Sequence, residues 1–229
     1  MPVKENMRLL YENPLSCKED VRDFILEGEA RISFPNGRMR MQNVMDASAG
    51  QKANYVFWCP VEFPADIYIE WEFMPIEEPG LCILFFAAKG RNGEDLFAES
   101  LQKRTGEYPL YHHGDINAFH VSYYRRKEAD ERAFHTCNLR KSYGFHLVAQ
   151  GGDPIPDADE VTEPYKLGLL KKGGEIAFYI NALEIFRFCD NGQDYGPLLG
   201  GGKIGFRQLA PLTAEYGGLK VYAVGASAQ

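Results

Sequence analysis

The segment IYIEWEFM at residues 67–74 alternates strictly along its length, and this pattern most restricts what the chain can fold into. Successive side chains of an extended strand point to opposite faces, so its Ile, Ile, Trp and Phe share one face. Glycines (23) and prolines (13) separate short apolar runs of this kind along the whole chain. That rhythm is typical of a β-sandwich or barrel. Further strands are predicted at 81–88, 119–126, 143–150, 165–188 (three strands), 203–209 and 218–224.

Bulk properties exclude several classes of protein. The 229 residues contain no visible repeat or linker, and we expect one all-β domain over 1–229. The net charge of −7 argues against a nucleic-acid or anionic-membrane partner, and no apolar run approaches a membrane span. Five widely spaced cysteines without a C-x-x-C pair, and an N-terminus without an apolar signal, predict reduced thiols in a cytoplasmic protein.

Several blocks of sequence carry a family resemblance. YKLGLLKKGGEIAFYIN at 165–181 and the ending GGGKIGFRQLAPLTAEYGGLKVYAV resemble the late strands of concanavalin A-like (galectin-like) jelly rolls. INAFHVSYYRR, NLRKSYGFHLVAQGGD, DYGPLLGGGKIGFRQ and AEY are similar to the YesU-like family of uncharacterised bacterial proteins, over roughly residues 8–224. The resemblance implies a two-sheet antiparallel jelly-roll sandwich and a place in plant or algal polysaccharide degradation, without an established activity.

All five histidines lie between residues 112 and 146. In the strand at 119–126, Phe119, Val121 and Tyr123 suit a core face. The opposite face then carries His120, Ser122, Tyr124 and Arg126. In 143–150 the same reasoning assigns Phe145, Leu147 and Ala149 to the core and places His146 and Gln150 outside. We therefore expect the imidazoles to line an open groove on the concave sheet, with His112 and His113 at its rim.

The chemistry of these residue types suggests candidate roles. The catalytic candidates are His120, Tyr124, Arg126 and His146. A His–Tyr–Arg set suits β-elimination from a uronate: an arginine (Arg126 or Arg140) neutralises the carboxylate, a histidine removes the C5 proton, and Tyr124 protonates the leaving oxygen. The substrate-binding candidates are His112, His113, Asn138, Arg140, Glu72 and Gln150. Glu70 and Glu72 share a strand face, for which a solvated outer surface is the favoured interpretation.

Three classes of function stay open. The first is an enzyme, a lyase or hydrolase of uronate-containing oligosaccharides, which is favoured because a stand-alone binding module would have no catalytic partner. The second is a non-catalytic, lectin-like carbohydrate-binding protein. The third is a structural protein that forms a homodimer through a sheet face. No cofactor is predicted, and no metal site, because H-E-x-x-H and calcium-loop spacings do not occur.

Overall fold

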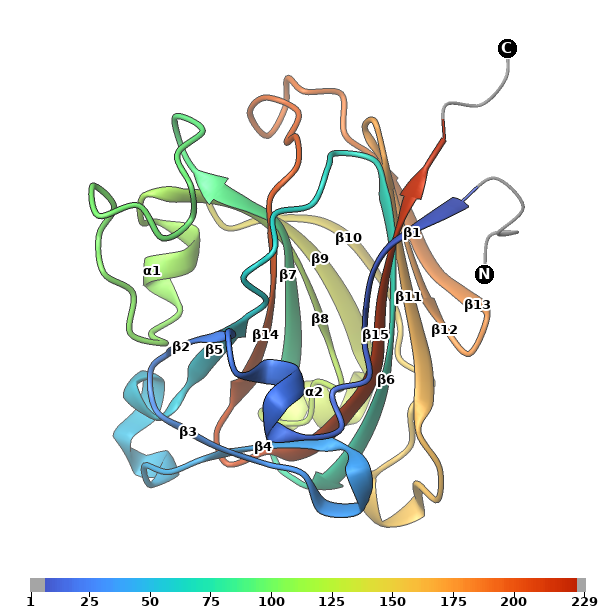
Figure 1. Cartoon of the computed structure of the whole chain (residues 1–229). Helices are drawn as coiled ribbons and strands as arrows, with labels where there is room; N and C mark the ends of the chain where they lie inside the picture. The colour runs from blue at the N-terminus through green and yellow to red at the C-terminus, as the bar shows by residue number, and fades with distance from the viewer. Residues whose placement is uncertain (1–6, 226–229) are drawn as a thin grey trace.

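Two antiparallel β-sheets pack face to face, as the alternating segments predict (Figure 1). The computed structural model describes residues 7–225. Sheet A has the spatial order β13 (Leu183–Cys189), β12 (Glu175–Ile180), β11 (Tyr165–Lys172), β6 (Ile67–Glu77), β15 (Thr213–Val224), β4 (Met39–Asn43) and β3 (Ala30–Ser33), with β1 (Met7–Asn13) also on β15. Sheet B has the order β10 (His146–Gly152), β9 (Thr136–Ser142), β8 (Ile116–Tyr123), β7 (Leu81–Gly90), β14 (Lys203–Leu209), β5 (Tyr55–Trp58) and β2 (Ile25–Glu27).

Helices contribute only short connections. They are α1 (Pro109–His112), α2 (Ala129–Phe134) and the 3-10 turns Lys18–Val21, Pro35–Gly37, Ala47–Ala53 and Ala158–Glu160. None of the helices within residues 7–225 has the length and apolar character required to cross a bilayer.

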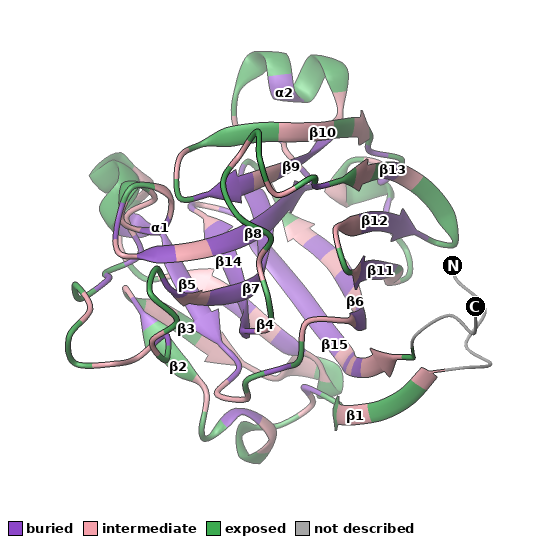
Figure 2. Cartoon of the chain, turned by 90° about the horizontal axis from the view of Figure 1, so that it is seen from above, coloured by how far each residue is buried: buried purple, intermediate pink, exposed green. Residues whose placement is uncertain are grey.

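The main core lies between the sheets and follows the predicted alternation. In β6, Ile69, Trp71 and Phe73 are almost completely buried against sheet B. In β8, Phe119 and Val121 point toward sheet A. Figure 2 shows β7 and β14 in the buried colour along much of their length, whereas the edge strand β10 is largely exposed.

A second apolar cluster lies on the face of sheet B that points away from sheet A, which we call the outer face of sheet B. There Trp58 and Phe85 pack beneath residues 91–113, the segment that contains α1 (Figure 1). The buried carboxylate of Glu27 accepts hydrogen bonds from Trp58 Nε1 at 2.8 Å and from the Tyr111 hydroxyl at 2.9 Å. The segment is thereby fixed over β5 and β7, whereas the edge strand β10 stays largely exposed.

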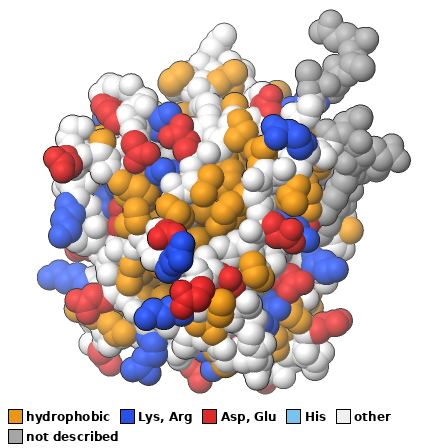
Figure 3. Space-filling model, in the orientation of Figure 1, with side chains coloured by type: hydrophobic (Ala, Val, Ile, Leu, Met, Phe, Trp, Pro, Cys, Tyr) orange, Lys and Arg blue, Asp and Glu red, His pale blue; other side chains and the backbone are white. Residues whose placement is uncertain are grey.

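The surface and the thiols agree with the bulk properties. On the face shown in Figure 3, acidic and basic side chains are interspersed and neither sign dominates. All five cysteines lie in the described part of the chain and are free, with Cys17 and Cys189 exposed.

Candidate functional site

The outer face of sheet B carries the candidate site. Because Phe119 and Val121 point into the main core, the alternate residues His120 and Ser122 point outward, which is the face the sequence predicts for them. Directly paired residues of neighbouring strands share a face. His120 is opposite Arg140, and Ser122 is opposite Asn138. Four candidate side chains of β8 and β9 therefore lie on one surface.

A shallow groove of about 120 Å³ crosses this surface. Strands β7, β8, β9 and β14 form its floor, and the loops before α1 and after β9 form its walls. Its lining consists of Leu81, Ile83, Tyr108, Ser122, Arg125, Glu131, Asn138, Arg140, Phe145 and Leu209. A volume this small holds part of a ligand, because pockets that enclose a whole drug-sized molecule are roughly 300–1,000 Å³.

Tyr108 forms the junction between the groove and the covered half of the sheet. Its hydroxyl oxygen lies 2.7 Å from Nε2 of His120. His120 is completely buried, and its Nδ1 has no hydrogen-bond partner among the described residues. Tyr108 itself lines the groove. The tyrosine is therefore the group that can meet a ligand, and the histidine supports it from below. The expectation that His120 faces substrate directly is wrong, because residues 91–113 cover it.

Arg140 projects along the groove floor from β9. Its guanidinium lies 3.8 Å from the centre of the Phe145 ring, and its Nη1 donates to the Phe145 carbonyl at 3.0 Å. Within residues 7–225, no carboxylate lies within ion-pair distance of Arg140, whereas Arg125 beside it pairs with Glu131 at 2.7 Å. Arg140 thus presents a charge that no side chain neutralises.

A second arginine without a carboxylate partner lies under the groove. Arg207 of β14 is fully buried, with its guanidinium carbon 4.6 Å from the centre of the Tyr108 ring. Its Nη2 donates to the Gly106 carbonyl at 3.1 Å and to Gln51 at 3.3 Å, while Nε and Nη1 have no partner in the part of the chain that the structure describes. Burial lowers the pKa of Arg207 to about 10, which leaves the group cationic at neutral pH.

Burial and the two arginines shift the pKa values of the rings around them, with burial as the larger cause. Burial lowers the pKa of His120 well below its ordinary 6.5, and the charge of Arg140 lowers it further. Burial raises the pKa of Tyr108 to about 12, although Arg207 and Arg140 oppose this rise. At neutral pH the imidazole is therefore neutral and the phenol is protonated. A positive potential remains over the groove, and it favours an anionic ligand.

The rim of the groove contains more predicted residues. Gln150 of β10 is opposite Asn138, and the side-chain amide groups of the two residues lie 2.7 Å apart. His112, at the end of α1, packs against both Tyr108 and Phe145, with ring centres 4.7 and 4.5 Å apart. Burial lowers the pKa of His112 to about 4, helped by the adjacent His113.

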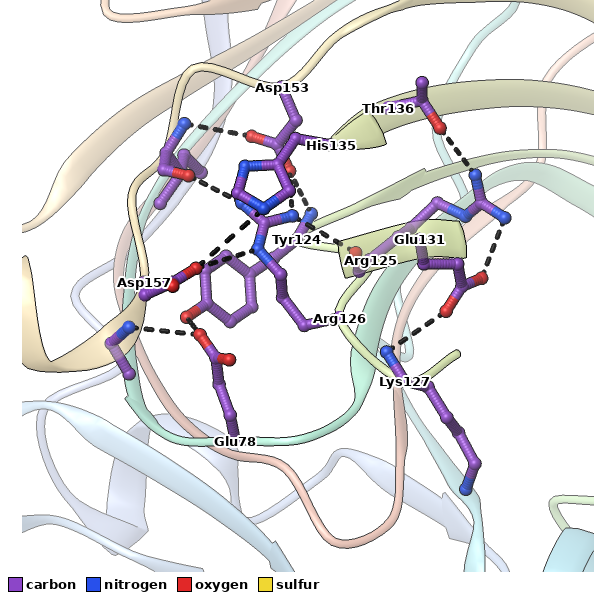
Figure 4. Close-up of polar contacts among 12 residues, drawn as sticks. Glu78, Tyr124, Arg125, Arg126, Lys127, Glu131, His135, Thr136, Asp153 and Asp157 are labelled. Atoms are coloured by element: carbon purple, nitrogen blue, oxygen red, sulfur yellow. Dashed lines mark hydrogen bonds and ion pairs between the residues drawn. The ribbon is translucent and has the colours of Figure 1, made fainter. Parts of the chain in front are cut away.

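Tyr124 and Arg126 lie elsewhere, and their expected place in the groove is wrong (Figure 4). Both are completely buried. Arg126 lies 4.8 Å above the Tyr124 ring, 3.5 Å from Asp153 and 3.5 Å from Asp157, and its Nη2 donates to the Ile155 carbonyl at 2.6 Å. These contacts join the end of β8 to the loop after β10.

The reason for this error is a break in the strand. β8 ends at Tyr123, and Tyr124 has a φ of +49°, in the left-handed region that interrupts alternation. The Tyr124 ring then turns into the core against Phe73, and its hydroxyl donates to Glu78. Alternation is a property of continuous strands, so it cannot place residues beyond this point.

His146 lies on the opposite face of sheet B from His120. It pairs with Lys141, which pairs with Phe119 on the core side, whereas Arg140 pairs with Leu147. A bulge between Leu147 and Ala149 shifts the register, so that Phe145 and Leu147 are exposed instead of buried. A single site that contains both imidazoles is therefore excluded.

Glu72 belongs to the other sheet. It lies in a hollow of about 590 Å³ on the outside of sheet A, next to Glu70 and Lys220. Its carboxylate accepts a hydrogen bond from Arg38 at 2.7 Å, and Lys220 pairs with Glu12 at 2.8 Å. Glu72 cannot reach a ligand on the outer face of sheet B, and both Arg38 and Lys220 pair with neighbouring carboxylates.

Sequence reasoning missed Tyr108, Phe145 and Arg207. Tyr108 precedes α1 outside any strand, so alternation gave no signal for it. Arg207 had such a signal in KIGFRQL, because Ile204 and Phe206 face the main core and their neighbour must point outward. No group of three or more His, Cys, Asp or Glu side chains within residues 7–225 is arranged to hold a metal ion.

Comparison with known proteins places the chain among uncharacterised relatives. Residues 8–221 match the family model described as Domain of unknown function (DUF1961). The uncharacterised protein YesU of Bacillus subtilis (strain 168) is 56% identical over 207 residues, which are 90% of this chain and 92% of YesU. A crystal structure of a protein of unknown function with a galectin-like fold from Bacillus subtilis superimposes with a TM-score of 0.91 at 53% identity, covering 95% of this chain and 98% of the other.

More distant structures share the fold alone. A non-specific endo-β-1,3(4)-glucanase of family GH16 matches with a TM-score of 0.63 at 8% identity, over 98% of this chain and 94% of the other. The carbohydrate-binding module CBM66 from Bacillus subtilis matches with a TM-score of 0.52 at 11% identity, over 86% and 92%. The galectin-like sandwich is thus shared with proteins that bind or cleave carbohydrates.

Proposed function

The chain belongs to the DUF1961 family, and we propose that this member binds an acidic oligosaccharide in the groove on the outer face of sheet B. The main observation is the guanidinium of Arg140, which lies 3.8 Å from the centre of the Phe145 ring and has no carboxylate within ion-pair distance among residues 7–225. A planar guanidinium binds a carboxylate through two parallel hydrogen bonds, and such bonds are stronger than those between neutral groups. A uronate is the sugar that supplies this carboxylate.

The other groups of the groove suit the rest of a sugar. Ser122 and Asn138 offer a hydroxyl and an amide to ring hydroxyls, and Phe145, 40% exposed, offers an apolar surface to the carbon face of the ring. The buried charge of Arg207 under Tyr108 adds attraction for the carboxylate.

The residues that line the groove do not match those of a two-carboxylate glycosidase. Such hydrolases place two carboxyl groups about 5–9.5 Å apart across the scissile bond. Among the described residues that line the groove, Glu131 is the one carboxylate. It is already bonded to Arg125 at 2.7 Å and to the backbone N–H groups of Lys127 and Glu128 at 3.1 and 3.0 Å. The proposed ligand is therefore bound without that type of hydrolysis.

The contact between Tyr108 and His120 favours a second function, β-elimination from the bound uronate. With the carboxylate on Arg140, the Tyr108 oxygen would take the C5 proton while it passes its own proton to His120 Nε2. The C5–H electron pair would form a C4–C5 double bond, and the C4–oxygen bond would break. The proton on His120 would return through Tyr108 to the leaving oxygen. A neutral His120 is required, and its lowered pKa supplies that state.

Calorimetric titration tests the binding proposal. Oligogalacturonates and oligoglucuronates are compared with the same chains after reduction of their carboxyl groups to alcohols. We expect binding of an acidic chain and at least a tenfold weaker affinity for its reduced form. Equal affinity for the two forms would refute recognition of the carboxylate, and an increase in absorbance at 235 nm would identify elimination.

A further inference from the structure

A second hollow lies on the other side of the turn between β9 and β10, which the proposed function does not use. Its volume is about 370 Å³. It is lined by Arg91, Asn117, Lys141, Ser142, Tyr143, His146, Asp194, Tyr195, Gly196, Pro197 and Leu199. The hollow mixes aromatic rings with hydroxyl, amide and charged groups, the combination that a sugar residue requires.

Ser142 lies in the wall of this hollow and is 1% exposed. Among residues 7–225, its Oγ has no hydrogen-bond partner. Buried hydroxyl groups are normally paired, because burying an unpaired one is costly. Because Ser142 is opposite Ala118, which belongs to the apolar cluster on the outer face of sheet B, its side chain points to that face, and the ligand contacts of the hollow come from its other lining residues.

The wall of this hollow is built rigidly. The ammonium group of Lys141 is 1% exposed and bonds to Asp190 at 2.6 Å and to the carbonyls of Gly196 and Pro197 at 2.9 and 2.7 Å. These bonds use all three donors of the ammonium group. They hold the loop 190–199 against β9, with the Tyr195 ring 5.4 Å from the ring of His146.

A continuous series of rings, which we call the ring track, joins the groove to this hollow. The track runs from Tyr108 to Phe145 (5.4 Å between ring centres), then to His112 (4.5 Å), His113 (4.5 Å) and Tyr143 (5.7 Å). Phe145 and Tyr143 are 40% and 42% exposed. Tyr143 also lines the hollow, so the track begins in one depression and ends in the other.

We propose that the hollow at Ser142 is a second subsite, and that one oligosaccharide chain spans both depressions along the ring track. This inference rests on the proposed function. An acidic residue occupies the groove at Arg140, following residues pack their carbon faces on Phe145 and Tyr143, and a residue of the same chain enters the hollow beside Tyr195 and His146. Three of the five histidines thereby acquire a common role, since His112 and His113 are members of the track and His146 lines the hollow at its end.

Dependence of affinity on chain length tests the two-subsite arrangement. Oligogalacturonates and oligoglucuronates of two to six units are titrated into the wild type, Tyr195→Ala and Arg140→Gln. We expect the wild type to gain at least tenfold in affinity between two and six units. Tyr195→Ala should lose most of this gain while its disaccharide affinity stays within twofold of the wild type. Arg140→Gln should weaken binding at every length.

The possible failures are distinguishable. A disaccharide affinity equal to the six-unit affinity in the wild type would overturn the second subsite and leave the groove proposal intact. Absence of binding at every length would overturn the groove proposal and, with it, the second subsite. Phe134→Ala is the matched control, because Phe134 is 76% exposed and lies outside both depressions; it should bind like the wild type. Circular dichroism of Tyr195→Ala verifies that this variant folds. Tyr143→Ala is a second variant, which should also lose most of the increase in affinity between two and six units.

Discussion

The hydroxyl oxygen of Tyr108 lies 2.7 Å from Nε2 of His120, so a residue that lines the groove is bonded to one that is completely buried beneath it. The contact connects the covering segment 91–113 to β8 of the sheet. The same contact brings together the neutral imidazole and the protonated phenol that the proposed β-elimination requires.

Loss of the Tyr108 hydroxyl should destabilise the protein. Tyr108→Phe leaves both ring nitrogens of the buried His120 without a protein partner, because Nδ1 already lacks one. An unpaired buried polar group lowers the free energy of unfolding by about 1–3 kcal/mol. Urea denaturation of Tyr108→Phe and the wild type measures this difference. Tyr143→Phe, at an exposed ring, is the control and should change stability little. Equal stability of Tyr108→Phe and the wild type would show that the contact contributes nothing.

Removal of the Arg140 charge should weaken ligand binding without affecting the fold. Hydrogen bonds to charged groups contribute about 1.5–3 kcal/mol, which corresponds to a roughly 10- to 150-fold loss of affinity in Arg140→Gln. Arg22→Gln is the matched control, because the Arg22 side chain is 70% exposed and pairs with Asp23. Calorimetry with an oligouronate measures both variants. A change in affinity of less than twofold in Arg140→Gln would refute the proposed binding of a carboxylate by Arg140.

For Arg126 we expect a loss of stability, in contrast to the loss of ligand binding expected for Arg140. Its side chain and that of Asp153 are both 0% exposed, and breaking a buried ion pair leaves an uncompensated charge. Arg126→Met should therefore lower the free energy of unfolding by about 3–5 kcal/mol in urea denaturation. The double variant Arg126→Met, Asp153→Asn should recover part of the loss. A fully stable Arg126→Met that no longer binds ligand would restore the site role that the sequence predicted.

Stability should fall as the pH falls below about 6.5. The folded-state pKa values of His112 and His120 are lowered, to about 4 for His112, so the unfolded chain binds protons first. A state that binds more protons is favoured by acid, and the free energy of unfolding therefore decreases from pH 7 to pH 5. His120→Gln should show a smaller decrease over this interval in urea titrations. An identical slope would contradict the lowered pKa of His120.

The sequence predicted the fold and about half of the site, for reasons that particular residues explain. Uninterrupted alternation in β6 and β8 assigned Trp71, Phe119 and His120 to their correct faces. The prediction failed where alternation stops, at the left-handed backbone of Tyr124 and at the bulge after Leu147.

The sequence also did not indicate which segment of the chain covers the outer face of sheet B. Residues 91–113 bury His120 and bring Tyr108 into the groove, and these contacts join residues far apart in the chain. Local patterning contains no signal for which loop lies over which sheet. The same holds for Glu72, whose strand face was correctly judged to be outward, but on sheet A.

The most direct test is a crystal structure of the protein with an oligogalacturonate or oligoglucuronate of at least four units. We predict a sugar carboxylate in the groove on the outer face of sheet B, within 4 Å of the Arg140 guanidinium, which is the distance range of an ion pair. A chain bound instead in the hollow on the outside of sheet A, against Glu70 and Lys220, would contradict it.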